Sequence, residues 1–251
     1  MRLQSLIHPL FARTCRPFRN TIRSMAFLAA ILSPVICVAQ TESAPEKKKE
    51  GVMIRLLCVQ SLTKDEQEAG LATQTESGEW IERGNVTLRT PFISSWLPLP
   101  VGTIHLTRKD RDKTISIGSF AIPANSERCI IVLLPDKTKN IYRTQVIDPG
   151  KLGFQQGKAL VINYGTIPAM VKMGKLMITV NPGEQVVEKI DANENGMYRL
   201  LVGHMDKDKN IVPCYDHFVS SNPKTRKFIL LFPDKKSGLR AMSLSEFGPF
   251  E

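Results

Sequence analysis

A ten-residue pattern that occurs twice limits the folds open to this chain of 251 residues. Residues 128–137 read RCIIVLLPDK, and residues 226–235, which begin 98 positions later, read RKFILLFPDK. Solenoids and similar arrays repeat about every 20–50 residues. A spacing near 98 residues therefore indicates a duplicated domain. We place the boundary within residues 148–158 and predict domains at 51–150 and 151–251.

The flanks of the two copies also correspond. Gly78-Glu79-Trp80 opens a strand-like run, as Gly174-Lys175-Leu176 does 96 positions later. Both copies end in Pro-Asp-Lys, where proline cannot donate to a sheet ladder and aspartate favours a turn. We therefore predict that the two copies form the same strand and turn of two related domains.

Short apolar or alternating runs follow one another between clusters of Gly, Pro, Asn and Asp, a pattern typical of β-sandwiches. It predicts an all-β fold of two tandem, related β-sandwich (Ig-like) domains. One segment, residues 63–76, is polar and is expected to form a loop or a short surface helix. The predicted strands fall in 52–60, 102–108, 114–122, 128–134, 141–147, 159–164, 175–180, 184–190, 197–205, 210–219 and 227–232.

Residues 1–39 have the composition of a cleavable signal peptide. An Arg-rich stretch without acids precedes the uncharged apolar run from Met25 to Ala39, and small residues stand just before Gln40. The run is shorter than the roughly 20 residues that cross a bilayer, so no transmembrane span is expected after cleavage. Polar residues 40–50 predict a disordered linker. We expect a periplasmic or otherwise exported protein, with mitochondrial import as the alternative.

The net charge of +10 does not indicate a nucleic-acid partner. Half of it comes from the five arginines of residues 1–39, which leave with the signal peptide. The remaining basic residues alternate with acids, whereas a nucleic-acid footprint needs basic side chains clustered on one face. We therefore expect no nucleic-acid partner.

Three cysteines remain in the predicted mature chain: Cys58, Cys129 and Cys214. An odd number without paired spacing does not form a disulfide framework. Cys58 and Cys129 lie in apolar runs of the same half, so a disulfide between them stays open. Burial as small hydrophobic side chains is the preferred interpretation for all three.

Turn glycines and strand hydrophobic residues recur in LLPDK (133–137), VIDPG (146–150), FQQG (154–157), LVIN (160–163), VKMG (171–174) and VNPGEQVV (180–187). In this order, they resemble a family of uncharacterised exported bacterial proteins. The resemblance implies a signal peptide, two β-sandwich halves and an envelope location. It implies no activity.

Asp191, Asn193 and Asn195, followed by Gly196, match the opening of a calcium-binding loop. Such a loop needs a bidentate Glu at its twelfth position, where this chain has Val202. A turn between two strands is the preferred interpretation, so we expect no metal or other cofactor. The segment 206–210 departs further from the pattern and is expected to be a hairpin tip.

No other motif indicates catalysis. His105, His204 and His217 lack metal-ligand spacing. If 197–205 and 210–219 form a hairpin, His204 lies near its tip and His217 near its far end. Ser94-Ser95 and Ser220-Ser221 lack a nucleophile elbow.

Trp80 and Trp96 are the only tryptophans. Prolines at 91, 98 and 100 flank Trp96, which predicts a sheet edge or loop because each proline removes a ladder donor. We expect its indole to be tucked under the chain rather than presented to a ligand.

The sequence thus favours a non-enzymatic envelope protein that binds a partner protein or glycan or has a structural role. The alternative is a carbohydrate-active or other hydrolytic enzyme whose site is assembled only in three dimensions.

We predict that the mature chain begins at or near Gln40, because the apolar run and the small residues before it suit signal peptidase. N-terminal sequencing of the exported protein checks this. Mature protein that still begins at Met1 would contradict it.

Overall fold

The computed structural model describes residues 51–63, 67–208 and 210–248. The regular secondary structure of these residues consists of β-strands alone. The all-β fold class is confirmed. The predicted signal peptide (1–39) and linker (40–50) lie outside the described residues. Within the described part of the chain, no helix is long and apolar enough to span a membrane.

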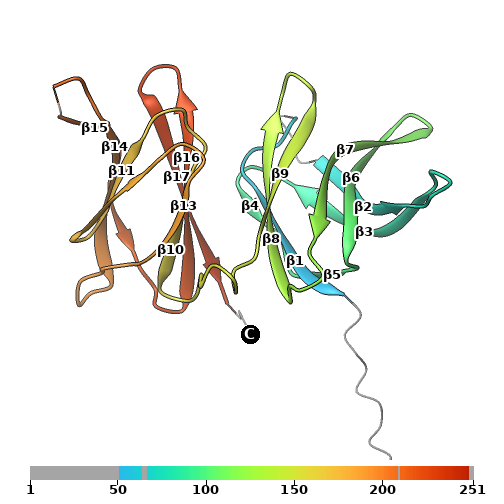
Figure 1. Cartoon of the computed structure of the whole chain (residues 1–251), viewed down its shortest axis with the longest axis horizontal. Coiled ribbons are helices and arrows are strands. Elements are labelled where there is room, and N and C mark those ends of the chain that lie inside the picture. The colour runs from blue at the N-terminus through green and yellow to red at the C-terminus, as the bar shows by residue number, and fades with distance from the viewer. Residues whose placement is uncertain (1–50, 64–66, 209, 249–251) are drawn as a thin grey trace, which may run out of the picture. The chain divides into compact units, whose positions relative to one another are not determined.

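The N-terminal half contains two sheets that pack face to face (Figure 1). Sheet A has the order β4-β1-β8-β9, and β5 also pairs with β1. Sheet B has the order β3-β2-β6-β7. The strands are β1 (Val52–Cys58), β2 (Gln67–Gln74), β3 (Trp80–Leu88), β4 (Phe92–Ile93), β5 (Leu97–Leu99), β6 (Gly102–Asp110), β7 (Lys113–Ile122), β8 (Arg128–Asp136) and β9 (Ile141–Ile147).

The C-terminal half repeats this arrangement. Sheet C has the order β13-β10-β16-β17, and sheet D has the order β12-β11-β14-β15. The predicted domain boundary lies in the connection between β9 and β10. The strands are β10 (Lys158–Asn163), β11 (Ala169–Met173), β12 (Leu176–Val180), β13 (Gln185–Lys189), β14 (Met197–Met205), β15 (Ile211–Ser220), β16 (Thr225–Asp234) and β17 (Gly238–Phe247).

The two copies of the repeated sequence take corresponding places in the two strand orders. β8 pairs in parallel with β1 and antiparallel with β9, and β16 pairs in the same way with β10 and β17. Each Pro-Asp pair closes a hairpin, at Asp136 in one half and Asp234 in the other. Trp80 and Leu176 likewise begin the corresponding strands β3 and β12. The strand placement predicted from the repeat is therefore confirmed, whereas the immunoglobulin-like topology stays a prediction with which these sheets are compatible.

The central strands of sheets A and C are apolar on both faces. On β8, Cys129, Ile131 and Leu133 belong to the core between sheets A and B. The alternate residues Ile130 and Val132 belong to a different cluster, which contains side chains of sheet C. Side chains of a strand point alternately to its two faces. Continuous apolar runs are therefore expected where both faces are buried, as is usual for parallel strands.

We call the contact between sheets A and C the seam. Its apolar centre draws on both halves, which belong to one compact unit. The fully or nearly fully buried members are Leu57, Val59, Ile130, Val132, Ile147, Phe154, Leu160, Ile162, Phe228 and Leu230. Burial of a side chain of this size contributes about 1.5–3 kcal/mol. The seam is thus a third hydrophobic core in addition to those of the two sandwiches.

Polar contacts flank the apolar centre of the seam. In one group, Tyr164 donates a hydrogen bond to Gln145, which also contacts Gln185 at 3.1 Å. In the other, Glu246 accepts hydrogen bonds from Arg55 at 2.7 Å and from Arg226 at 2.9 Å. Both groups join residues of different halves.

Residues 63–76 were expected to be a loop or surface helix, and this expectation was wrong for residues 67–74. Residues 67–74 form β2, in the interior of sheet B. Ala69 and Leu71 face the core, while Glu68 and Gly70 face outward. The alternation of small or apolar with polar residues was a strand signal that the high polar content concealed.

The proline-rich segment around Trp96 lies at a sheet edge, as predicted. β4 and β5 are short and pair with β1 on the side opposite β8. Pro98 lies within β5, and an edge strand tolerates a residue without an amide donor.

We predict that Glu246→Ala lowers the free energy of unfolding by about 3–5 kcal/mol, because it leaves two guanidinium groups in the seam without their carboxylate. Urea denaturation checks this. Asp216→Ala, which removes the carboxylate of an exposed arginine pair, is the control and should leave the midpoint nearly unchanged. Equal effects of the two substitutions would contradict the buried role of Glu246.

Candidate functional site

Three arginines from separate strands come together on the seam side of their sheets. Arg55 lies in β1, Arg128 begins β8 and Arg226 is the second residue of β16. Each is an even number of positions from a seam residue on its own strand: Leu57, Ile130 and Phe228 respectively. The period of two therefore directs all three side chains to the seam.

Glu246 of β17 balances two of these charges. Its side chain is 1% exposed and bridges Arg55 and Arg226. Arg226 also donates a hydrogen bond at 3.1 Å to the carbonyl of Phe154. Burial lowers the pKa of Arg226, and its ion pair with Glu246 opposes that shift. The charges of Arg55 and Arg128 lower the pKa of Arg226 further, which shows that the three cations influence one another.

Trp96 positions two of the arginines. The guanidinium carbon of Arg55 lies 4.5 Å from the centre of the indole ring, and that of Arg128 lies 5.7 Å from it. Such cation–π contacts stabilise a cation over the ring face. The indole is half-buried, and its Nε1 is buried without a hydrogen-bond partner among the described residues. The expectation that Trp96 is tucked in is met in this form, with arginines as its neighbours.

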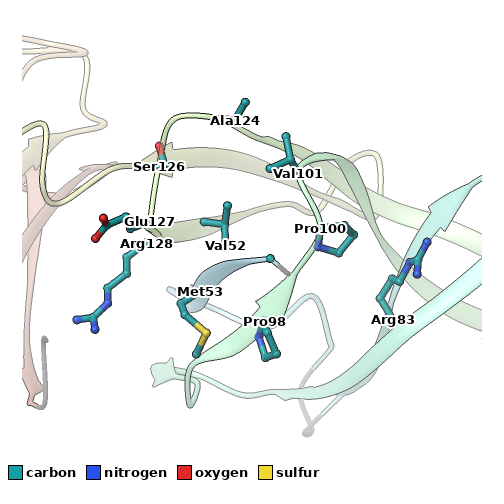
Figure 2. A pocket seen from close by; sticks show the side chains of 11 residues that line it. Val52, Met53, Arg83, Pro98, Pro100, Val101, Ala124, Ser126, Glu127 and Arg128 are labelled. Carbon is teal, nitrogen blue, oxygen red and sulfur yellow. The ribbon is translucent and has the colours of Figure 1, made fainter. Parts of the chain in front are cut away.

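Arg128 differs from the other two arginines because no carboxylate binds it in the described part of the chain. It lines two pockets, of about 960 and 980 Å³, that share Glu127 and Arg128. Figure 2 shows the first pocket, with Arg83 and Arg128 at opposite ends and the Arg128 side chain directed away from Val52. We call the two pockets together the Arg128 groove.

The second pocket of the groove is lined by amides and charged groups. Asn125, Gln155 and Gln156 supply both hydrogen-bond donors and acceptors. Lys151 and Asp148 form an ion pair at 3.6 Å. Because Arg226 is bound to Glu246 and Lys151 to Asp148, Arg128 is the cation of this pocket that is left for a ligand.

Asp148 stays ionised in this environment. Burial raises the pKa of its carboxyl, but a hydrogen bond from the Ser126 hydroxyl at 2.6 Å and the contacts with Lys151 outweigh burial. The resulting pKa is below the usual value. Asp148 is therefore suited to accept hydrogen bonds and unsuited to serve as a general acid.

Asp191 and Asn193 of the suggested calcium loop accept hydrogen bonds from backbone amides. Asn193 Oδ1 accepts hydrogen bonds from the amides of Asn195 and Met197, and Asp191 accepts one from the amide of Lys175. Asn193, Asn195 and Gly196 form a turn between β13 and β14. Asp206 holds the tip of the β14–β15 hairpin in the same way. Among the described residues, no three His, Cys, Asp or Glu side chains are grouped as a metal site requires.

The histidines lie in separate places. His204 and His217 are on paired strands, opposite Val212 and Leu200, so four register positions separate them. His105 packs edge-on against Trp80 at a centroid distance of 5.1 Å.

Ser94, the first serine of the pair in the N-terminal half, has a structural role. Ser94 Oγ accepts a hydrogen bond from the Leu56 amide and donates one to the Ser95 carbonyl. Its hydroxyl therefore holds the edge of sheet A. Ser220 uses its carbonyl to accept a hydrogen bond from Lys227.

All three cysteines are free thiols, so the alternative of a Cys58–Cys129 disulfide was wrong. In the register of β1 and β8, Cys58 is opposite Leu133 and Cys129 is opposite Ile54, which places the two cysteines four positions apart. Burial raises the pKa of Cys58 to about 11 and also raises the pKa of Cys129. Such thiols are weak nucleophiles.

Sequence reasoning did not identify the arginine cluster, although two features of the sequence correspond to it. Arg55 interrupts an otherwise apolar strand, and Arg128 and Arg226 occupy the same position of the repeated pattern. A charge within a buried run needs a partner. The partner, Glu246, is 191 positions from Arg55, which no local pattern could indicate.

Comparisons with known proteins do not add an activity to this geometry. No protein-family model matches the chain, and no curated protein matches it.

Proposed function

We propose that this protein is a non-enzymatic binding module that holds an acidic polypeptide segment in the Arg128 groove. The observation that carries the proposal is the Arg128 guanidinium, which is fixed against Trp96, lines both pockets and lacks a carboxylate partner in the described part of the chain. A planar guanidinium matches a carboxylate with two parallel hydrogen bonds. A carboxylate of the ligand would supply the partner.

The size and lining of the groove support a ligand longer than one residue. Each pocket has a volume at the upper end of the range of roughly 300–1,000 Å³ that is usual for ligand sites. The amides of Asn125, Gln155 and Gln156 can pair with the N–H and C=O groups of a peptide. Arg83, 45 positions before Arg128 and at the other end of the first pocket, adds a second cation.

The same lining favours a polypeptide over a glycan. Sugar rings commonly stack their C–H faces on an open aromatic ring. Phe154, the aromatic residue that lines the groove, is 1% exposed and packs against Phe228. The ring of Trp96 is covered by guanidinium groups.

A hydrolytic enzyme remains the second function class, since Glu127 and Asp148 line the same pocket. Paired carboxylates cleave glycosidic bonds when one of them holds a proton and acts as general acid. The lowered pKa of Asp148 leaves that role to Glu127 alone. Because Asp148 is also bound to Ser126 and Lys151, the geometry supports binding better than turnover.

We infer an envelope or extracellular location for this activity. The proposal rests on the signal-like composition of residues 1–39, and it is tested by the N-terminal sequencing described above.

We predict that Arg128→Gln weakens binding of a hexaglutamate peptide about tenfold or more, because a hydrogen bond to a charged group contributes about 1.5–3 kcal/mol. Binding is followed by the fluorescence of Trp96 in a Trp80→Phe background, since Trp96 contacts Arg128 directly. Higher ionic strength should weaken binding as well.

Arg143→Gln is the matched control, because it removes an exposed arginine of β9 that lines none of these pockets. A hexalysine peptide controls for general binding of peptides. The proposal fails if hexaglutamate gives no saturable signal or if the two arginine variants weaken binding equally. Release of cleaved products from peptide or polysaccharide during incubation would instead support an enzyme.

A further inference from the structure

The outer face of sheet D is apolar although the fold does not require it. Val171, Leu200 and Val202 point into the core of the C-terminal half, so the alternate residues of the same strands point outward. Six of the outward side chains are large and apolar, and we call them the D face: Met170, Met177, Leu201, Met205, Ile211 and Phe218. Phe218 is 74% exposed and Met177 is 49% exposed.

The corresponding face of the N-terminal half is polar. Sheet B takes the same place as sheet D in its half, and its outer face includes Glu68, Glu82, Asn85 and Thr107 beside Trp80, which packs against His105. The duplicated fold is therefore compatible with a polar outer face. Contiguous exposed apolar surface indicates an interaction site.

The D face contains a hollow and a projecting ring of matching size. Met170, Met177, Leu201 and Ile211, with the stems of Lys172 and Arg199, line a hollow of about 180 Å³. Apolar cavities of about 150 Å³ bind benzene. Phe218, opposite Arg199 on β15, presents a phenyl ring next to this hollow. The phenyl ring of Phe218 from a second molecule has a size that suits this hollow.

Two of the charges on the D face neutralise each other. Arg199 and Asp216 form a two-pronged ion pair across β14 and β15, at 2.7 and 2.6 Å. Lys172 is a further cation at the hollow, and a copy of the face can cover it in a two-fold arrangement with the Arg199–Asp216 pair of each copy already neutral. A strongly charged partner would gain little from such a face.

We propose that the D face is a homodimer interface in which Phe218 of each copy enters the hollow of the other. The inference is independent of the Arg128 groove. The seam shows the same principle within one chain, because there the apolar outer faces of sheets A and C cover each other. The four strands of sheet D have 5, 5, 9 and 10 residues. At a spacing of about 4.8 Å between strands and a rise of about 3.3 Å per residue, they give a face of roughly 450 Å². Specific interfaces bury about 800 Å² per partner, so this dimer is at the weak end and should form at micromolar concentration.

The test is sedimentation equilibrium of the purified protein over about 1–200 µM, a range chosen for a weak dimer. We expect a monomer–dimer equilibrium that higher salt does not weaken, because the contact is apolar. Phe218→Ala should raise the dissociation constant about tenfold or more, as truncation of a central aromatic anchor does. Phe247→Ala, which removes a similarly exposed phenyl ring from β17, should leave it unchanged.

Two results would overturn the proposal. One is a monomer across the whole range, and the other is equal weakening by the two phenylalanine variants. Monomeric protein that binds phosphatidylcholine vesicles through Phe218 would assign the D face to a lipid surface instead. Phe218→Ala should retain hexaglutamate binding, which separates this test from that of the groove.

Discussion

The burial of both faces of sheets A and C is the constraint on which the rest of the structure depends. A sandwich sheet normally covers one face and leaves the other to solvent. Here the second faces cover each other, and the seam gains an apolar core of its own. A charge that is buried in the seam needs a partner, which is why Arg55 and Arg226 converge on Glu246. The proposed function rests on Arg128, because it belongs to the same set of arginines and lines a groove instead of pairing with a carboxylate.

The two halves have corresponding strand orders but different outer surfaces. The strand orders of the two halves correspond, and so do the arginines at the start of β8 and β16. The buried positions keep their apolar character in both copies, whereas the outer faces of sheets B and D differ. Arg226 pairs with Glu246, whereas its counterpart Arg128 lines both pockets of the groove and has no carboxylate partner among the described residues. The two halves thus share their strand order, whereas the proposed Arg128 groove draws on both halves and the proposed D face on the C-terminal half alone.

Local sequence was enough for the fold class and not for the site. Runs such as RCIIVLLPDK specify a strand and its turn, and their repetition specifies equivalent positions. A continuous apolar run also indicates two buried faces, but it does not say which sheet covers the second. The packing of sheet A against sheet C brings together Arg55, Trp96 and Glu246, which are distant in sequence. The segment that forms β2 was wrongly expected to be a loop or surface helix because of its many polar residues. Its alternation of apolar and polar residues predicts a strand.

Equilibrium unfolding followed by two probes tests the seam most directly. Both tryptophans are in the N-terminal half, so their fluorescence reports on that half, while far-UV circular dichroism reports on the strands of both. If the seam joins the halves into one cooperative unit, the two urea transitions coincide. If the halves are merely tethered, the fluorescence transition separates from the circular dichroism transition. Coincident curves are the expected result, and two resolved transitions would contradict the account.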